Sequence, residues 1–142
     1  QIELGTQILQ SIFDQNPQNT DLALGIGHSF LIQDKFDEAI YYYEQFRQGK
    51  QDSEEVLVGL AFAYSQTKRF EESLPLYQRV AQKSLENFKI YEASNELDSQ
   101  SLIQAREDLK EKYLEYWVAA QKTGNEDAMV EAQRTLEKVF LE

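Results

Sequence analysis

The sequence repeats itself at a fixed interval, the separation between Gly25 and Gly59, and this repeat restricts the fold more than any other feature of the chain. When the chain is shifted by that interval, apolar and small residues fall on apolar and small residues. The matched pairs are Gly25 with Gly59, Ile26 with Leu60, Gly27 with Ala61, Phe30 with Tyr64, Phe36 with Phe70, Ala39 with Ser73, Ile40 with Leu74, Tyr43 with Tyr77 and Phe46 with Val80. An interval of about 34 residues is typical of helical hairpins that stack to bury a continuous core.

Each repeat contains two runs of apolar residues at helical spacing, separated by a short polar turn. The turn is Gln33-Asp34-Lys35 in the first repeat and residues 66–69 in the second. The apolar positions of the four predicted helices are Ala23, Ile26, Gly27, Phe30; Phe36, Ala39, Ile40, Tyr43, Phe46; Leu57, Leu60, Ala61, Tyr64; and Phe70, Ser73, Leu74, Tyr77, Val80. The pattern therefore predicts antiparallel helical hairpins over residues 20–53 and 54–87.

Small residues at matched positions indicate where two helices approach each other closely. They are Gly27, Ala39, Ala61 and Ser73. A glycine inside a helix costs about 1 kcal/mol relative to alanine. The recurrence of glycine at Gly25 and Gly59 therefore predicts a close backbone approach at both places.

Residues 1–19 predict one further helix, which Asn16 and Pro17 end. Its apolar face consists of Ile2, Gly5, Leu9 and Ile12. The spacing of these residues before Pro17 is that of the second helix of a hairpin whose first helix is absent. We expect this segment either to come from a larger array or to cap the stack, with an apolar face left open.

Beyond residue 82 the phase of the repeat is lost, although helical spacing continues. Residues 70–96 contain no strong breaker, so one long helix and two helices with a corner both remain open. Pro75 is expected near the first turn, where proline costs little. Asn95 to Ser101 predicts a loop, and Ser101 with Gln104 matches a capping box for the next helix.

Two more helices are predicted before the end of the chain, separated by a turn at Thr123-Gly124-Asn125. Their apolar positions are Leu102, Ala105, Leu109, Tyr113, Tyr116, Trp117 and Ala120, and then Met129, Ala132, Leu136, Val139 and Phe140. We interpret residues 88–142 as a degenerate repeat with C-terminal capping helices.

These motifs make the chain resemble the tetratricopeptide repeat family over residues 20–87. The family pattern is aromatic-x2-Leu-Gly-x2-Tyr followed by Ala-x3-Phe and a proline. It appears here as Ala23-x2-Ile26-Gly27-x2-Phe30 with Ala39-x3-Tyr43, and as Leu57-x2-Leu60-Ala61-x2-Tyr64 with Ser73-x3-Tyr77. The chain departs from the pattern at Ala23 and Ser73, and Gln51 and Leu85 stand where a proline would close each repeat.

The resemblance implies an all-α fold in which antiparallel hairpins stack into a right-handed superhelix, an α-solenoid. It implies a single domain over residues 1–142. In this family the first helix of each hairpin lines the concave face of the superhelix, where a peptide or helix of a partner lies. The corresponding residues outside the packing face are Leu24, His28, Leu31, Val58, Phe62 and Ser65, with Asp21 and Glu55 at one edge. The alternative is that C-terminal helices fold back and cover them.

Composition argues against several kinds of function. The chain has no cysteine, which excludes disulfides, thiolate metal sites and thiol nucleophiles and leaves the compartment open. A net charge of −11 disfavours nucleic acid and anionic membrane surfaces. No stretch approaches the roughly 20 apolar residues of a membrane span.

The sequence also lacks motifs for catalysis, metal binding or cofactor binding. His28, the one histidine, lies within a predicted helix beside Gly27, where a catalytic role is disfavoured. No calcium-ligand spacing, phosphate-binding loop or dinucleotide fingerprint occurs. The sequence therefore predicts no enzyme, no cofactor and no metal. Of Tyr41 and Tyr42, which adjoin the core position Tyr43, at least one is expected on the surface.

The predicted function is a protein–protein interaction module that binds a peptide or helix of a partner in the groove, as scaffold, adaptor or chaperone. Repeats that grip acidic chaperone tails carry cationic and amide side chains on their first helices. Leu24, His28, Val58 and Phe62 stand on that face here, which argues against this subtype. The alternative is a structural segment of a longer helical-repeat protein that self-associates, as a homodimer, through open helix faces.

Overall fold

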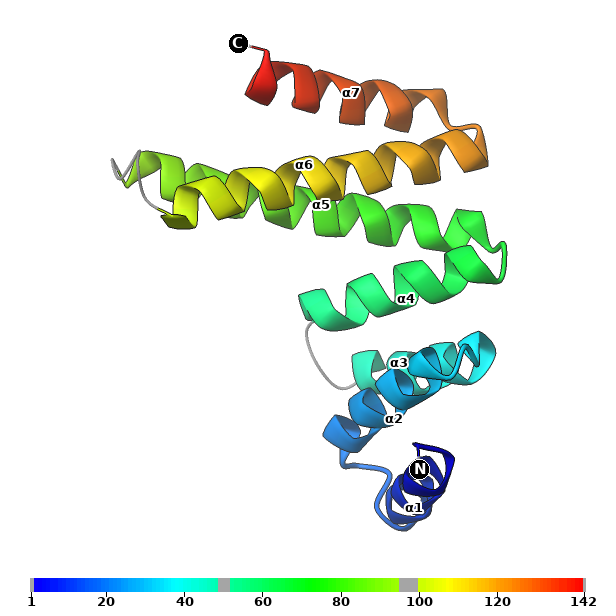
Figure 1. Cartoon of the computed structure of the whole chain (residues 1–142). Coiled ribbons are helices and arrows are strands. Elements are labelled where there is room, and N and C mark those ends of the chain that lie inside the picture. Colours follow the sequence, from blue (N-terminus) through cyan, green and yellow to red (C-terminus); the bar gives the residue numbers. More distant parts are fainter. Residues whose placement is uncertain (1, 49–51, 95–99, 142) are drawn as a thin grey trace. The chain divides into compact units, whose positions relative to one another are not determined.

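A computed structural model of the chain describes residues 2–48, 52–94 and 100–141, and the secondary structure in these ranges is helical, without strands (Figure 1). The helices are α1 (Ile2–Gln15), α2 (Thr20–Ile32), α3 (Phe36–Gln48), α4 (Glu54–Gln66), α5 (Phe70–Ala93), α6 (Gln100–Thr123) and α7 (Glu126–Phe140). The all-α helical-repeat fold predicted from the sequence is confirmed. Contacts divide the chain into two compact units, Gln1–Arg69 and Phe70–Glu142, and each is described by itself.

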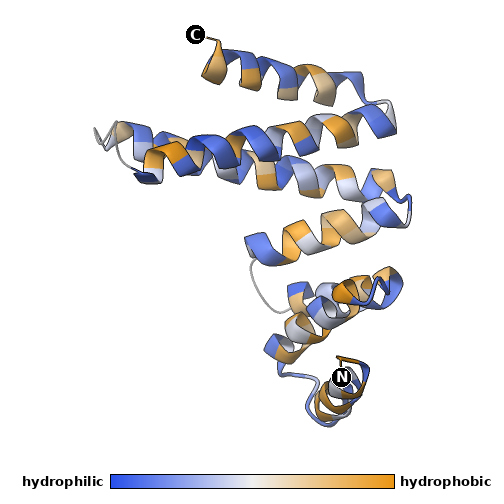
Figure 2. Ribbon diagram, in the orientation of Figure 1, coloured by the Kyte–Doolittle hydropathy of each residue, from blue (hydrophilic) through white to orange (hydrophobic). Residues whose placement is uncertain are grey.

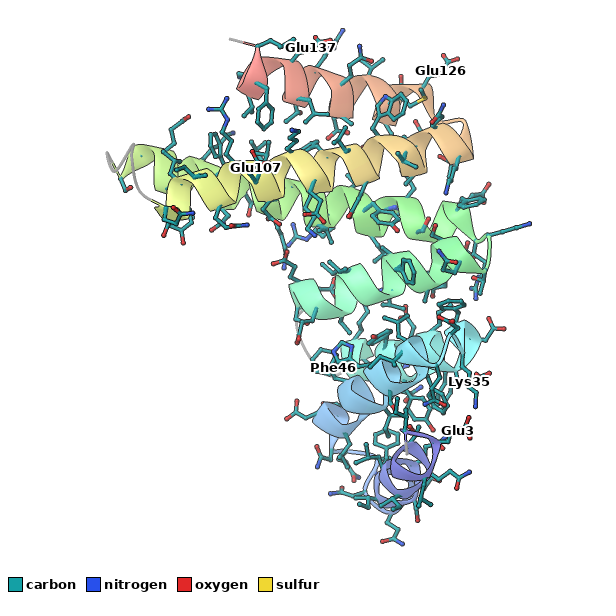
Figure 3. The ribbon with its side chains drawn as sticks, viewed as in Figure 1. Glu3, Lys35, Phe46, Glu107, Glu126 and Glu137 are labelled. Atoms are coloured by element: carbon teal, nitrogen blue, oxygen red, sulfur yellow. The ribbon has the colours of Figure 1, made fainter. Side chains whose placement is uncertain are left out.

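In the first unit, α2 and α3 form a hairpin, α4 packs on both, and α1 packs on α2. The predicted core faces are confirmed. The fully or nearly fully buried residues include Ala23, Ile26, Phe30, Ala39, Ile40, Tyr43, Phe46, Leu57, Leu60, Ala61 and Tyr64. Figure 2 shows apolar residues along α2 and α4, and Figure 3 shows side chains filling the spaces between neighbouring helices.

The three consecutive tyrosines of α3 differ in burial, because successive residues of a helix point in different directions. Tyr43 is 0% exposed, Tyr42 is 9% exposed and Tyr41 is 57% exposed. Tyr42 stacks on Phe30 and meets the edge of Phe13 from α1. The prediction that at least one of these tyrosines lies on the surface is therefore confirmed for Tyr41.

Helix α1 is attached through a partly polar face. Its buried residues are Thr6 and Phe13, and Gln10 donates a hydrogen bond to the hydroxyl of Tyr42 at 3.1 Å. The Thr6 hydroxyl is hydrogen-bonded to Ser29 of α2. Other apolar residues of the helix stay exposed, and they share only Ile2 and Ile12 with the predicted face, because Leu9 is half-buried. They are Ile2, Leu4, Ile8 and Ile12.

Helices α2 and α4 end in the same kind of turn, at matched positions of the repeat. Asp34 and Lys68 have positive φ angles of 59° and 63°. The following amides, of Lys35 and Arg69, bond back to the carbonyls of Phe30 and Tyr64 at 2.9 and 2.8 Å. These bonds satisfy carbonyls that the helix end leaves without a partner. The repeat period therefore extends to the backbone conformation of the turns.

The second unit settles the question left open for residues 70–96, because α5 is one helix of 24 residues. Pro75 lies within it in the second turn, not the first, so its ring removes the amide that would bond the carbonyl of Glu71. The predicted cap at Ser101 is wrong, since α6 begins at Gln100 and Ser101 lies inside its first turn. The loop predicted before it falls largely on residues 95–99, outside the described residues.

The core of the second unit is built from α5, α6 and α7. The predicted core residues Ala105, Leu109, Tyr113, Tyr116, Ala120 and Ala132 are buried there with Phe88. Gly124 turns the chain with a φ of 70°, and the Asn125 side chain caps α7 by accepting from the amide of Ala128 at 3.0 Å. The exposed Glu126 and Glu137 point away from α6 (Figure 3). The described helices include none that is both long and apolar enough to cross a membrane.

The left-handed turn at Lys68 gives a test of the fold. L-residues other than glycine adopt this conformation at a cost of roughly 1–2 kcal/mol. We expect Lys68→Gly to raise the free energy of unfolding by about 1 kcal/mol. The measurement is urea denaturation followed by circular dichroism. Lys68→Ala, which removes the side chain but keeps the strained backbone, should give no gain, and equal effects of the two variants would contradict this account of the turn.

Candidate functional site

The ring of Tyr43 occupies the space between α2 and α4. A Cβ placed on Gly27 of α2 would lie 2.8 Å from Cδ1 and Cε1 of that ring, and one placed on Gly59 of α4 would lie 2.8 Å from Cζ. Both distances are too short for real carbon atoms. The ring therefore fits only because a side chain is missing on each side of it, and a shift away from one helix would move it into the other.

The sequence prediction for the glycines is confirmed at Gly59 and wrong at Gly25. A Cβ on Gly25 would have no atom within 4 Å, and the residue is exposed. The physical reason lies in the residue opposite. The position that matches Tyr43 one repeat earlier is Leu9, which is only half-buried on α1. Without a buried aromatic ring beside it, Gly25 meets nothing.

The hydroxyl end of Tyr43 pairs with the one histidine of the chain. Tyr43 Oη lies 2.7 Å from Nδ1 of His28, and the two rings meet edge to face. Burial, with a smaller contribution from the negative charge of Glu55, raises the pKa of Tyr43 to about 12. In the described part of the chain, the other ring nitrogen of His28, Nε2, is buried without a hydrogen-bond partner. A buried polar atom in this state costs roughly 1–3 kcal/mol.

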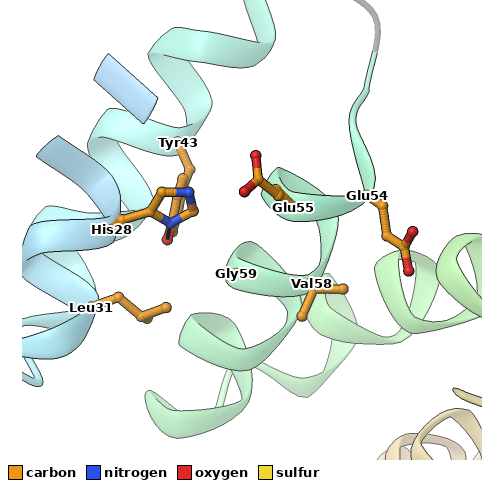
Figure 4. A pocket seen from close by; sticks show the side chains of 7 residues that line it. All are labelled: His28, Leu31, Tyr43, Glu54, Glu55, Val58 and Gly59. Carbon is orange, nitrogen blue, oxygen red and sulfur yellow. Dashed lines mark hydrogen bonds between the residues drawn. The ribbon is translucent and has the colours of Figure 1, made fainter. Parts of the chain in front are cut away.

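These residues line an open, mostly apolar pocket of about 390 Å³ between α2 and α4. Figure 4 shows His28 and Leu31 on the α2 side and Val58 on the α4 side, with the Glu55 carboxylate on the side that faces His28. The pocket lining is His28, Leu31, Tyr43, Glu54, Glu55, Val58 and Gly59. Its volume lies within the roughly 300–1,000 Å³ usual for ligand pockets.

Three of the six predicted site residues, His28, Leu31 and Val58, come together in this pocket. The other three, Leu24, Phe62 and Ser65, do not line it. Phe62 is 42% exposed and packs edge to face against Phe36 of α3 at 5.9 Å between ring centroids. The pocket thus contains half of the predicted residues and lies toward the start of α4.

Sequence reasoning did not place Tyr43, Gly59 or Glu54 among the site residues. The helical spacing of Tyr43 predicts a core residue, and its ring is indeed buried. The spacing does not predict that its hydroxyl bonds His28 in the pocket wall. Glu54 could have been found, because it stands four residues before Val58 and so shares its helix face. Acidic residues are common at the start of a helix because they interact favourably with the helix dipole. Their presence there therefore gives no sign in the sequence that they also line a pocket.

The arrangement offers little for catalysis or metal binding. Among the residues that the structure describes, no group of three or more histidine or carboxylate side chains could hold a metal ion. The hydrogen bond at Nδ1 of His28 joins it to a tyrosine hydroxyl whose raised pKa keeps it protonated. What the pocket presents is an apolar surface with carboxylates at its edge.

Comparisons with known proteins point to one family. A tetratricopeptide repeat family model matches residues 30–93. The crystal structure of MamA is similar, with a TM-score of 0.56, 17% sequence identity, and coverage of 97% of this chain and 88% of that one. The structure of YrrB, described as a TPR protein with an unusual peptide-binding site, has a TM-score of 0.55, 12% identity, and coverage of 99% and 79%. No curated protein sequence matches the chain.

The family match supports a protein–protein interaction module as the general class of function, and proteins of this repeat family are generally not enzymes. The similarities to solved structures, at 12% to 17% identity, concern the fold.

Gly25 and Gly59, at the same position of successive repeats, provide a matched pair of substitutions. We expect Gly59→Ala to lower the free energy of unfolding by about 1–3 kcal/mol, because its Cβ would overlap the Tyr43 ring. Gly25→Ala should raise it by up to about 1 kcal/mol, because alanine favours the helix and meets open space. Urea denaturation measures both. Equal shifts for the two variants would show that the ring is not held as described.

The hydroxyl of Tyr43 predicts a dependence on alkaline pH. Its pKa is about 10 in the unfolded chain and about 12 in the folded one. Its contribution to stability is therefore complete below pH 10 and is lost as the pH rises toward 12. At pH 8, Tyr43→Phe should be about 1 kcal/mol less stable than wild type through the lost hydrogen bond. The deficit should shrink at pH 11; a deficit that stays constant in urea denaturation at both pH values would contradict the prediction.

Proposed function

Because the chain is a tetratricopeptide-like repeat domain, we propose that the pocket between α2 and α4 binds a peptide segment of a partner protein, as part of a scaffold, adaptor or chaperone. The observation that carries the proposal is the pocket itself. Leu31 and Val58, one from each helix, leave part of their apolar surface open at its wall. Apolar surface gathered in a concave site is a usual mark of a binding surface.

The polar groups beside the pocket fit a peptide as well. Glu54 and Glu55 line the pocket with Leu31 and Val58, and their carboxylates accept hydrogen bonds. A peptide backbone offers both donors and acceptors along its length. A peptide therefore supplies both an apolar side chain for the pocket and amide donors for the carboxylates beside it.

The rigidity of the pocket wall favours binding as well. Tyr43 is fully buried and held between two glycines, so the wall is formed before any ligand arrives. Binding to a preformed surface loses less conformational entropy than binding that must order the site. YrrB, described as a TPR protein with an unusual peptide-binding site, has a similar fold, and at 12% identity the similarity concerns the fold alone.

The experiment is a selection of random seven-residue peptides displayed on phage, on wild type and on Val58→Trp. The tryptophan fills the pocket without adding charge to an apolar site. We expect synthetic versions of the selected peptides to bind Val58→Trp at least about tenfold more weakly than wild type in fluorescence polarisation, the loss usual for a central contact.

The matched control is Ile32→Trp, which places the same side chain at a position of α2 that is 70% exposed and outside the pocket. It should bind like wild type. Circular dichroism spectra and unfolding midpoints establish that both variants fold. If no selected peptide distinguishes Val58→Trp from Ile32→Trp, the pocket is not the binding site.

A second candidate function, self-association, is favoured by α1. Leu4, Ile8 and Ile12 lie four residues apart on one face of the helix and are 57%, 54% and 47% exposed. Apolar surface of this kind can pair with a second copy of the chain. Light scattering over a hundredfold range of concentration, on wild type and Ile8→Glu, tests this: a mass that is constant for both excludes it.

A further inference from the structure

Charge is distributed unevenly among the helices of the first unit. Helices α2 and α4, which form the two sides of the pocket, carry the acidic residues Asp21, Glu54 and Glu55 and no lysine or arginine. Helix α3 also starts with two acidic residues but carries Arg47, which bonds Asp52 at 2.9 Å and Glu44 at 3.3 Å. Helix α1 likewise carries no lysine or arginine, so the distinction within the unit is between α3 and the other three helices.

Glu54 and Glu55 bring negative charge to the pocket. Both are exposed and line it. Within the described residues, no lysine or arginine forms an ion pair with either of them. The field of Glu55 reaches into the pocket wall, since it contributes to the raised pKa of Tyr43.

The pocket therefore combines two chemistries side by side. Leu31 and Val58 provide an apolar surface, and carboxylates stand beside it at the first turn of α4. A ligand that fills the apolar part with an acidic neighbour would bring like charges together, which disfavours binding. A ligand with a cation beside its apolar group would gain charge-assisted hydrogen bonds instead.

We propose that the pocket selects peptide segments in which a large apolar residue stands within two positions of a lysine or arginine. The apolar side chain enters between Leu31 and Val58, and the cationic side chain pairs with Glu54 or Glu55. This inference rests on the proposed function, because it concerns the specificity of the same pocket. It assigns to the partner a basic, partly apolar segment.

The spacing follows from the geometry of the helix. Glu54 stands four residues before Val58, one turn away on the same face. One helical turn rises about 5.4 Å, and neighbouring residues of an extended peptide are about 3.3 Å apart. A lysine or arginine one or two positions from the apolar residue can therefore reach the carboxylates.

The test compares peptides selected by phage display on wild type with those selected on Glu54→Gln/Glu55→Gln. The control is Asp37→Asn/Glu38→Gln, which removes two exposed carboxylates from the first turn of α3 and so matches the loss of helix-dipole interactions. Lysine or arginine should be enriched at least twofold near the apolar residue on wild type and on the control, and not on the glutamine variant of α4.

Synthetic peptides from the wild-type selection give the affinity. We expect binding to Glu54→Gln/Glu55→Gln to be about fivefold weaker than to wild type, the scale of two exposed ion pairs. Raising the salt from about 0.05 M to about 0.5 M should weaken wild-type binding by a similar factor, because salt screens exposed charges. Binding to the control should match wild type.

The outcomes separate this inference from the function on which it rests. If peptides lose affinity for Val58→Trp but show no excess of lysine or arginine, the pocket binds peptides and the charge selectivity is wrong. The selectivity is also wrong if the two carboxylates can be neutralised without loss of affinity. If Val58→Trp binds every selected peptide as wild type does, the proposed function fails and the selectivity fails with it.

Discussion

The first unit depends on the contact of the Tyr43 ring with two glycines. Helix α3 supplies the ring, and α2 and α4 supply Gly27 and Gly59, where a methyl group would come within 2.8 Å of it. This contact fixes three helices at one point, because a movement of the ring away from one glycine would bring it into the other helix. The same ring forms the pocket wall, since its hydroxyl reaches His28. Tyr43 therefore contributes both to the core and to the pocket wall.

The second unit joins its helices through a polar contact. One carboxylate oxygen of Glu131 on α7 accepts hydrogen bonds from the Tyr116 hydroxyl of α6 at 2.7 Å and from Gln78 of α5 at 3.1 Å. Burial, and then Glu131, raise the pKa of Tyr116, so the hydroxyl remains a donor through the alkaline range. The two donors satisfy this carboxylate, and the directions of the two hydrogen bonds fix how the three helices are aligned along one another. In the first unit, the corresponding alignment depends on the fit of the Tyr43 ring between two glycines.

The sequence predicts the helices well because helical spacing reports which residues are buried, and burial is what the repeat shares. It predicts less well what each small residue meets. Gly25 and Gly59 occupy the same repeat position, yet only Gly59 faces an aromatic ring, because α1 offers Leu9 where α3 offers Tyr43. At Ser101 the local capping pattern is wrong, because the helix already begins at Gln100. For the pocket, spacing identifies a face, and only the structure shows that His28, Leu31 and Val58 enclose a space.

The carboxylates of α4 show how a residue can meet a local requirement and still shape a site. Glu54 and Glu55 stabilise the start of the helix through its dipole, as Asp37 and Glu38 do on α3. On α3 the acidic surface is offset by Arg47 farther along the helix. On α4 the two carboxylates form no ion pair within the described residues, and their charge stands beside the apolar pocket. The helix start explains why carboxylates are favoured there. Within the described residues neither carboxylate has an ion-pair partner, and a cationic ligand would supply one.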